Sequence, residues 1–345
     1  MLYVGLDLSR KRLDWQALLP DGQRAALGAV PPDRDGLAKL AQRLGDAEVV
    51  AVIESMSGAR FVHDELELHG WQVRIADALK ARGIAPLACK TDTIDSWVLA
   101  ELARLALVPE IWLPDPAVRA ERERARFRLH LVKHRSSLKN RIHAILFQHG
   151  VPRPTSDLFG AGGRALLASL HLPEPWASTV GASLELIDVL DDQIAACEQE
   201  LRALGADHRY IPNLQTCPGI GWVLAFTIAS EIGDIGRFAS PRKLVGYTGL
   251  CPRVEQSGER DRRGPLRKNG PCYLRWALVE AAHSAIRRHP PYREVRDRMR
   301  ARHGRKRGTK IAAVEIGRRL SEAIWHMLTN NEPFAPAGAS GSLAA

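Results

Sequence analysis

The sequence predicts an α/β domain in the N-terminal part of the chain, followed by a mostly α-helical C-terminal part. Strand-like and helix-like segments alternate at the start of the chain, which is typical of α/β layers. Farther on, long segments carry apolar residues at helical spacing. We expect an N-terminal domain at 1–150, a linker and helical segment at 151–207, a C-terminal domain at 208–330 and a disordered tail at 331–345.

The N-terminal segments follow a recognisable order. Residues 2–8 and 13–19 are strand-like and joined by SRKR, which predicts a hairpin, and a helix is expected over 33–44. The apolar run VVAVIE (49–54) is typical of a buried parallel strand. A helix near 59–69, the strand WQVRI and a helix carrying Asp92 and Asp95 complete the segment. A hairpin followed by crossovers is the order of the RNase H-like fold.

The middle of the chain is predicted to be helical. One long helix is expected from Pro116 to about Gln148, and VPRPTSDLFGAGG (151–163) has the composition of a linker. Residues 178–204 carry Leu184, Ile187, Leu190, Ile194 and Cys197 at near-heptad spacing. This pattern fits a coiled-coil arm for dimerisation and equally a helix packed on its own domain.

A glycine-rich turn opens the C-terminal domain. The segment CPGIG (217–221) separates two helical stretches, as in a helix-hairpin-helix motif. Such a turn can hold a DNA phosphate on its backbone N–H groups. The alternative is that its glycines serve tight packing alone.

The chain's positive charge is concentrated in two segments. The 345 residues have a formal net charge of +10. Residues 251–320 hold 20 Lys and Arg against 7 Asp and Glu, and residues 119–141 hold 9 against 2. Such segments on an otherwise acidic body indicate a polyanion-binding surface, and the alternative is a set of solvated helix faces.

The cysteines and the apolar runs exclude several classes of protein. Five dispersed cysteines without a C-x-x-C pair argue against a disulfide framework and a zinc site. The chain enters a strand without a charged leader, and no apolar run approaches the roughly 18 residues of a membrane helix. We therefore expect a soluble, cytoplasmic protein with no membrane partner.

Four carboxylates are the strongest chemical signal. Asp7 and Glu54 stand at the ends of strand-like runs, and Asp92 and Asp95 are three residues apart, which puts them on one side of a helix. Each alone also fits a cap or turn residue. Together on this fold they would repel one another unless a hard cation such as Mg²⁺ lay between them, and two such ions suit phosphodiester chemistry.

A second candidate site surrounds Ser257, which precedes Gly258 in a polar segment that we expect to be a loop. Guanidinium groups there can bind a phosphate and make a serine hydroxyl a better nucleophile. The alternative is an ordinary Ser-Gly turn. The predicted nucleic-acid contacts are Arg253, Arg260, Arg262, Arg263, Arg267, Lys268, Arg275, Arg305, Lys306 and Arg307.

The motifs together resemble one family. The runs GLDLS, IES, KTD-x-ID-x-x-x-LA, PGIG, EIGDI-x-RF, L-x-x-Y-x-GL-x-P, SG and LR-x-x-L-x-x-A follow one another between residues 2 and 330. This series is similar to the DEDD-type insertion-sequence transposases, the recombinases guided by a bridge RNA, which are related to the Piv-type DNA invertases.

The resemblance implies a RuvC-like N-terminal domain with Asp7, Glu54, Asp92 and Asp95 as its Mg²⁺-binding acidic tetrad. It implies a C-terminal transposase domain with Ser257 as the nucleophile, which forms a covalent phosphoserine link to DNA. It also implies DNA and a noncoding guide RNA as partners, and dimers that pair into a tetramer.

Other readings of the same residues stay open. In a RuvC-like junction nuclease, water activated by Mg²⁺ would attack the DNA and Ser257 would be structural. A sugar kinase that uses GLDLS as a phosphate loop leaves the basic C-terminal part unexplained. A non-enzymatic nucleic-acid-binding protein with a decayed site is disfavoured, because all four acids and the serine are present.

Overall fold

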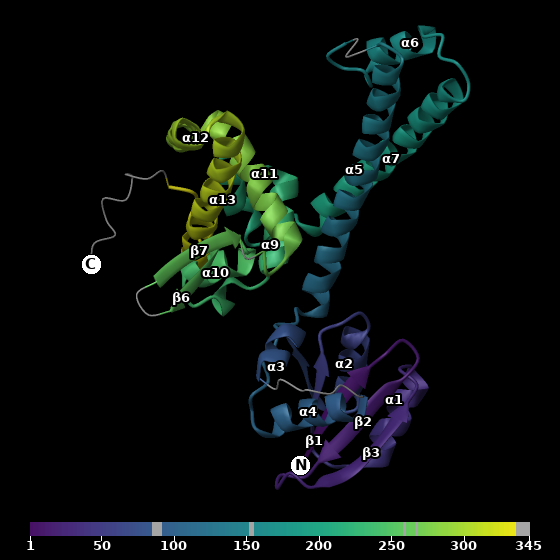
Figure 1. The fold of residues 1–345 in the computed structure, drawn as a ribbon, viewed down its shortest axis with the longest axis vertical. Coiled ribbons are helices and arrows are strands. Elements are labelled where there is room, and N and C mark those ends of the chain that lie inside the picture. Colours follow the sequence, from purple (N-terminus) through teal and green to yellow (C-terminus); the bar gives the residue numbers. More distant parts are fainter. Residues whose placement is uncertain (85–91, 152–154, 258–259, 267, 336–345) are drawn as a thin grey trace. The chain divides into compact units, whose positions relative to one another are not determined.

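The structure is a computed structural model that describes residues 1–84, 92–151, 155–257, 260–266 and 268–335 (Figure 1). Of residues 92–93, 254–257 and 260–263 it describes the backbone but not the side chains. The chain divides into two compact units, Met1–Pro114 and Asp115–Ala345, and each is described by itself. This division precedes the long helix, whereas the boundary expected at residue 150 follows it.

The N-terminal unit is built on a five-stranded mixed sheet in the order β3-β2-β1-β4-β5. Its strands are β1 (Leu2–Leu8), β2 (Leu13–Leu18), β3 (Arg24–Val30), β4 (Val49–Glu54) and β5 (Gln72–Ala76). The pairs β1–β2 and β2–β3 are antiparallel, whereas β1–β4 and β4–β5 are parallel. The predicted opening hairpin and the buried parallel strand are confirmed.

Helices cover both faces of this sheet. The helices of the unit are α1 (Arg34–Leu44), α2 (Ala59–Leu68), α3 (Ala78–Ile84) and α4 (Asp92–Arg104). Leu37 of α1 and Leu66 of α2 share one core cluster with Leu6 and Ile53. Successive strand residues point to opposite faces of the sheet. Val52, next to Ile53 in β4, therefore points to the other face, where it packs with Leu99 of α4.

Two elements of this unit are absent from the sequence prediction. β3 is an edge strand on which exposed and half-buried residues alternate, and its sequence RAALGAV is rich in alanine. Alanine and glycine are depleted in strands, so its composition does not indicate one. α3 is only seven residues long and buries Ala81 alone among its residues.

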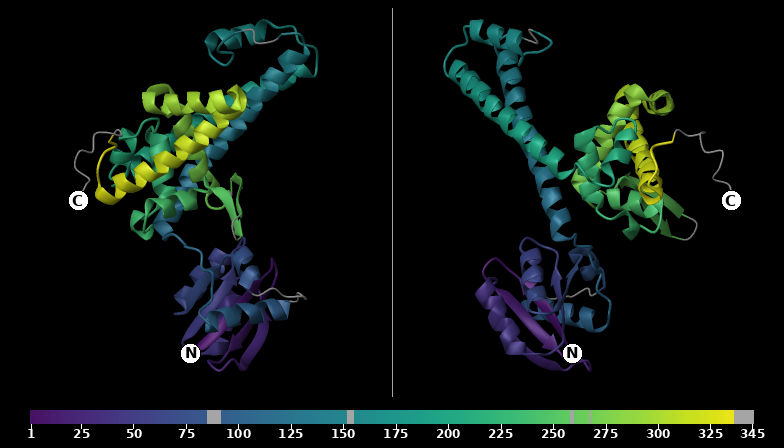
Figure 2. Two further views of the ribbon diagram at one scale, coloured as in Figure 1. Left: turned by 60° about the vertical axis from the view of Figure 1, so that its left-hand side comes forward. Right: turned by 180° about the vertical axis from the view of Figure 1, so that it is seen from behind.

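The C-terminal unit begins with a helical hairpin. α5 (Pro116–Gln148) spans the predicted long helix, and α7 (Trp176–Leu204) lies beside it, as Figure 2 shows. Ile142 and Leu146 of α5 and Ile187 of α7 are buried in one cluster. The near-heptad residues of α7 thus pack within the chain itself. α6 (Ala161–Ser169) begins inside the segment expected to be a linker.

The rest of the unit is a helical bundle with one small hairpin. Its elements are α8 (Ile211–Thr216), α9 (Trp222–Ile232), the 3₁₀ turn η1 (Ile235–Arg237), α10 (Pro241–Thr248), β6 (Pro252–Ser257), β7 (Arg260–Leu266), α11 (Cys272–Arg288), α12 (Pro290–His303) and α13 (Arg305–Asn330). Phe226, Leu278 and Ile316 are among the buried residues of its core. No helix in the described ranges is long and apolar enough to cross a membrane.

The last described residues contact the bundle. Asn213 donates a hydrogen bond from Nδ2 to Oδ1 of Asn331 (2.9 Å), and the backbone N–H of Phe334 donates to Oγ1 of Thr216 (2.8 Å). The side chain of Phe334 packs against the core of the bundle. Residues 331–335 are therefore attached to α8, and the rest of the predicted tail (336–345) lies outside the described residues.

Candidate functional site

Parallel pairing of β1 and β4 puts two of the predicted carboxylates side by side. Leu6 pairs with Ile53, so Asp7 and Glu54 follow at the carboxyl ends of neighbouring strands, about 4.8 Å apart from backbone to backbone. Both residues are half-buried. Alternation along the strands turns them to the sheet face that α4 covers.

A glycine brings α4 against β1. A Cβ atom on Gly5 would lie 1.8 Å from the carbonyl oxygen of Ser96 and 2.5 Å from the backbone nitrogen of Ala100. Only a residue without a side chain allows this approach of helix and strand backbones. Gly5 in GLDLS therefore sets the position of α4, a role that is not foreseen from the sequence. The available signal is a glycine inside a strand.

The first turn of α4 lies toward Asp7, because the helix runs antiparallel to β1. At the other end of the helix, Arg104 donates from Nη1 to the carbonyl oxygen of Pro20 (3.4 Å). Pro20 follows Leu18, which pairs with Tyr3 near the start of β1, so α4 runs antiparallel to β1. Asp95, half-buried, thus lies toward the edge of the sheet that carries Asp7.

Asp92 is the first residue of α4, about one helical turn before Asp95, and its side chain lies outside the described part of the chain. Asp7, Glu54, Asp95 and the backbone of Asp92 therefore occupy one edge, which we call the carboxylate edge. Within the described residues, no group of three or more His, Cys, Asp and Glu is arranged to hold a metal ion. The donor set consists of carboxylates alone, which fits Mg²⁺ or Mn²⁺ better than zinc.

A further acid beside the carboxylate edge was missed from sequence. Asp14 of β2 pairs with Asp7 across the antiparallel ladder. Arg12 binds its carboxylate with two hydrogen bonds, from Nε and Nη2, both of 2.8 Å. The guanidinium of Arg12 therefore brings positive charge close to Asp7. The LDW run in the second strand is the only sequence signal for it.

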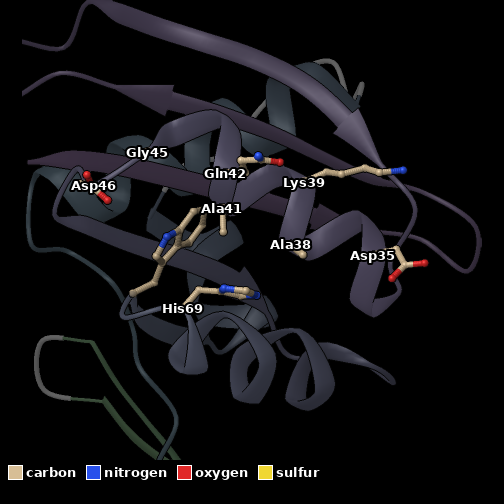
Figure 3. Close-up of a pocket in the computed structure, with 9 residues that line it drawn as sticks. Asp35, Ala38, Lys39, Ala41, Gln42, Gly45, Asp46 and His69 are labelled. Atoms are coloured by element: carbon tan, nitrogen blue, oxygen red, sulfur yellow. The ribbon is translucent and has the colours of Figure 1, made fainter.

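The cavity shown in Figure 3 lies elsewhere in the same unit. It measures about 690 Å³ and is lined by α1 and by residues that include Asp46, His69 and Trp71. Asp46 precedes β4 and Trp71 precedes β5, so these residues mark the amino ends of the parallel strands. Glu54 ends β4 at the opposite edge. This cavity is therefore separate from the carboxylate edge.

The segment around Ser257 forms a β-hairpin instead of the expected loop. β6 and β7 pair antiparallel, with Ser257 opposite Arg260 and Glu255 opposite Arg262. Ser257 is thus the last residue of β6. The side chains of Ser257, Arg260, Arg262 and Arg263, and all of Arg267, lie outside the described part of the chain.

Residues 268–270, which follow the hairpin, lie close to the end of α10 and to Arg275 of α11. Arg275 donates from Nη1 to the carbonyl oxygens of Thr248 (3.3 Å) and Lys268 (3.2 Å), which is a structural role beside the predicted contact with nucleic acid. A Cβ atom on Gly270 would lie 2.0 Å from the carbonyl oxygen of Tyr247. Arg253 and Lys268 are exposed.

The first basic segment forms ion pairs inside the protein. Arg126 of α5 binds the wholly buried carboxylate of Glu231 through Nε (2.7 Å) and Nη2 (3.0 Å). Arg128 and Arg135 bind Glu198 and Asp191 of α7. Several arginines of the polyanion-binding surface expected at residues 119–141 are therefore engaged in ion pairs within the protein.

The second basic segment is different. Arg305, Lys306 and Arg307 occupy the first turn of α13 and are exposed. In the part of the chain that the structure describes, none of these three has an acidic side chain within ion-pair distance. They remain available to a polyanion.

The glycine-rich turn between α8 and α9 packs against α11. Gly219 has φ +85°, and a Cβ atom there would lie 2.3 Å from the carbonyl oxygen of Ala281 and 2.6 Å from the nitrogen of Ala285. The helix–turn–helix arrangement is as predicted. Gly219 itself serves close packing, which is the alternative considered from sequence.

Comparisons with known proteins agree with this architecture. Residues 4–150 match the family model of DEDD transposases of the IS110 type, described as Transposase, and residues 211–297 match the Transposase IS116/IS110/IS902 family. The chain is 24% identical to a probable family 20 transposase of Pseudomonas aeruginosa, over 72% of this chain and 74% of the relative.

Two further relatives extend the likeness. The chain is 25% identical to the transposase for insertion sequence element IS1111A of Coxiella burnetii, over 71% of this chain and 68% of the relative. It is 29% identical to a putative transposase, y4rJ, of Sinorhizobium fredii, over 94% and 91%. Because both family models match in order along one chain, the protein belongs to the IS110/IS116 family of DEDD insertion-sequence transposases.

Proposed function

We propose that this transposase cuts DNA at the carboxylate edge of its N-terminal unit, and that this unit is a RuvC-like domain of the RNase H-like fold. The observation that carries the proposal is the parallel register that sets Asp7 beside Glu54, with the first turn of α4 directed to the same edge. The strand order, in which an antiparallel hairpin precedes parallel crossovers, supports the fold assignment.

The carboxylates supply oxygen ligands for divalent cations. Asp7, Glu54, Asp92 and Asp95 would hold Mg²⁺, which when bound supplies stabilisation of the negative charge that develops on the scissile phosphate. A carboxylate oxygen of this set that does not contact the cation can accept a proton from the attacking water. As the new P–O bond forms, the P–O bond to the leaving strand breaks.

A second candidate is attack by Ser257, as the resemblance implies. Its hydroxyl would form a covalent phosphoserine link, while arginines of the hairpin bind the phosphate. The position of Ser257 at the end of β6, opposite Arg260, favours this candidate. The match to a DEDD model supports cutting by the carboxylate edge more than it supports the serine.

We further propose a noncoding guide RNA as partner, and dimers that assemble into a tetramer. Exposed apolar side chains on α7, Leu186 (53% exposed) and Val189 (58%), are candidates for the contact between subunits. Omission of the RNA should abolish cutting of element ends, and light scattering of the full chain should report more than one subunit.

The test is a denaturing gel with element-junction DNA, Mg²⁺ and the cognate RNA. We expect Glu54→Gln and Asp95→Asn to cut on the order of 10²-fold more slowly, as loss of a catalytic carboxylate does. Asp46→Asn is the matched control, because it removes an exposed acid at the opposite edge of the same sheet.

The same gel separates the two candidates. Cut DNA without a protein–DNA adduct supports attack by water at the carboxylate edge. A covalent adduct that disappears in Ser257→Ala supports the serine. Normal cutting by both Glu54→Gln and Asp95→Asn would contradict any role of the carboxylate edge.

A further inference from the structure

A groove lies between the base of the β6–β7 hairpin and α13, within the C-terminal unit. Its volume is about 490 Å³, within the range of about 300–1,000 Å³ that is usual for small-ligand sites. The hairpin side includes Pro252, Pro265 and Leu266, and the helix side includes Ile311 and Val314. We call this the hairpin groove. Pro252 begins the strand that ends at Ser257.

The walls of the hairpin groove suit the flat face of a base. Pro252 and Leu266 pair at the base of the hairpin. Leu250, two residues before Pro252, also lines the groove. Gly317 of α13 lies close to Leu250, and a Cβ atom there would be 3.2 Å from Cδ1 of Leu250. Apolar side chains, proline included, contact unstacked bases in many complexes with nucleic acids.

One end of the groove is cationic. Arg307 and Lys310 line it from the first turns of α13, on the same side of the helix as Ile311 and Val314. Both are exposed, and neither has an ion-pair partner among the described side chains. They can therefore meet a phosphate beside a base held in the groove.

The other end of the groove is already neutralised. Glu315 receives hydrogen bonds from Arg318 and Arg319 at 3.0 Å. Arg318 also lies 3.5 Å from Oε1 of Glu322, so two carboxylates balance the two arginines. Burial opposes ionisation of Glu315, but these two arginines lower the pKa of its carboxylate below the ordinary value. The charge left for a ligand is thus that of Arg307 and Lys310. An anionic, partly apolar ligand fits this distribution.

We propose that the hairpin groove binds one unpaired nucleotide of a DNA strand, with its base between the hairpin and α13 and its phosphate on Arg307 and Lys310. A paired base cannot enter a concave site, so the strand must be unpaired there. We assign DNA because the chain belongs to a family of insertion-sequence transposases, which act on DNA. The inference rests on the proposed function in that the protein acts on DNA.

The test is a binding titration of the full chain without divalent cations. The probes are labelled oligothymidine, the same strand paired with its complement, and oligouridine. We expect Arg307→Gln with Lys310→Gln to weaken binding of oligothymidine about tenfold or more, and binding of the duplex about threefold or less. The matched control is Arg298→Gln with Arg302→Gln, which removes the same charge from exposed positions on α12.

If both double variants lost the same affinity for every probe, the proposal of a nucleotide site in the groove would be overturned, because surface charge alone would explain the binding. A loss confined to oligouridine would overturn the assignment to DNA. As a second variant, Ile311→Trp fills the groove without a change of charge and should remove the preference for the unpaired strand, with a thermal melt to verify folding. Because no metal is present, these results are independent of cutting. A protein that binds in the groove yet fails to cut contradicts the proposed function alone.

Discussion

Two arginine-rich regions of this chain have similar compositions and opposite surroundings. In α5, arginines meet acids that come from α7 and α9, and Glu231 is wholly buried among them. Across α12 and the first turns of α13, most basic side chains are exposed, and Arg305, Lys306 and Arg307 have no acidic partner in the described part of the chain. Charge density alone therefore does not identify a nucleic-acid surface.

The difference arises from acids far away in the sequence. Glu198 and Asp191 stand on the side of α7 that packs against α5, so each faces an arginine across the helical hairpin. In α13, Glu315 is occupied by Arg318 and Arg319, which lie toward the other end of the helix. The first turn of α13 keeps its positive charge for an external anion.

The largest expected effect is on α5. Burial alone would lower the pKa of Arg126, but its hydrogen bonds to Glu231 raise that pKa above the ordinary value, which indicates a strong pair. Arg126→Ala would leave a buried carboxylate with a poorer partner and should lower the free energy of unfolding by about 3 kcal/mol. Chemical denaturation with urea measures this change.

Its control removes both charges. Arg126→Met combined with Glu231→Gln should recover part of the stability, because the neutral amide needs no ion pair and its oxygen still faces the guanidinium of Arg122, 3.9 Å away in the parent protein. If Arg126→Ala kept full stability but lost DNA affinity, α5 would be a nucleic-acid surface and the comparison would fail.

An intermediate effect is expected on α13. Replacing Arg305, Lys306 and Arg307 together by glutamine should weaken DNA binding about tenfold or more. It should also reduce the slope of log K against log salt by roughly 0.9 for each phosphate that the variant no longer binds. Stability should change by less than about 0.5 kcal/mol, because the three side chains are exposed. An unaltered salt slope would mean that the first turn of α13 lies off the interface.

Much of the N-terminal unit can be predicted from sequence, because its signals are local. The apolar run VVAVIE contains its own evidence of burial. In the C-terminal unit, the long helix from Pro116 to Gln148 is likewise predicted from apolar spacing. The same local signals predict that Asp7 and Glu54 stand at the ends of strands. Parallel pairing of β1 with β4 supports that expectation for the backbone.

The remaining features depend on contacts between distant segments. The pairing of Arg126 with Glu231 joins residues more than a hundred positions apart, and no local pattern indicates it. The same holds for Gly5, whose role appears only when α4 lies against β1. The arginines and glycines around Ser257 favour a loop in the sequence, whereas residues 252–257 and 260–266 pair as antiparallel strands.

The smallest effect is expected at Arg124, which tests the comparison most closely. Arg124 pairs with Glu200 of α7 at 2.8 Å, but both side chains are about half exposed (53% and 52%). Solvent screens such a pair, so Arg124→Gln should change the free energy of unfolding by about 0.5 kcal/mol or less. DNA affinity should stay within about twofold, because a single charge paired with Glu200 contributes little to an external phosphate. Urea denaturation and the oligothymidine titration measure the two quantities on one preparation. Arg124→Gln removes one positive charge, whereas the α13 triple variant removes three. A tenfold loss of affinity in Arg124→Gln would therefore show that α5 contacts DNA even though acids of α7 pair with its arginines.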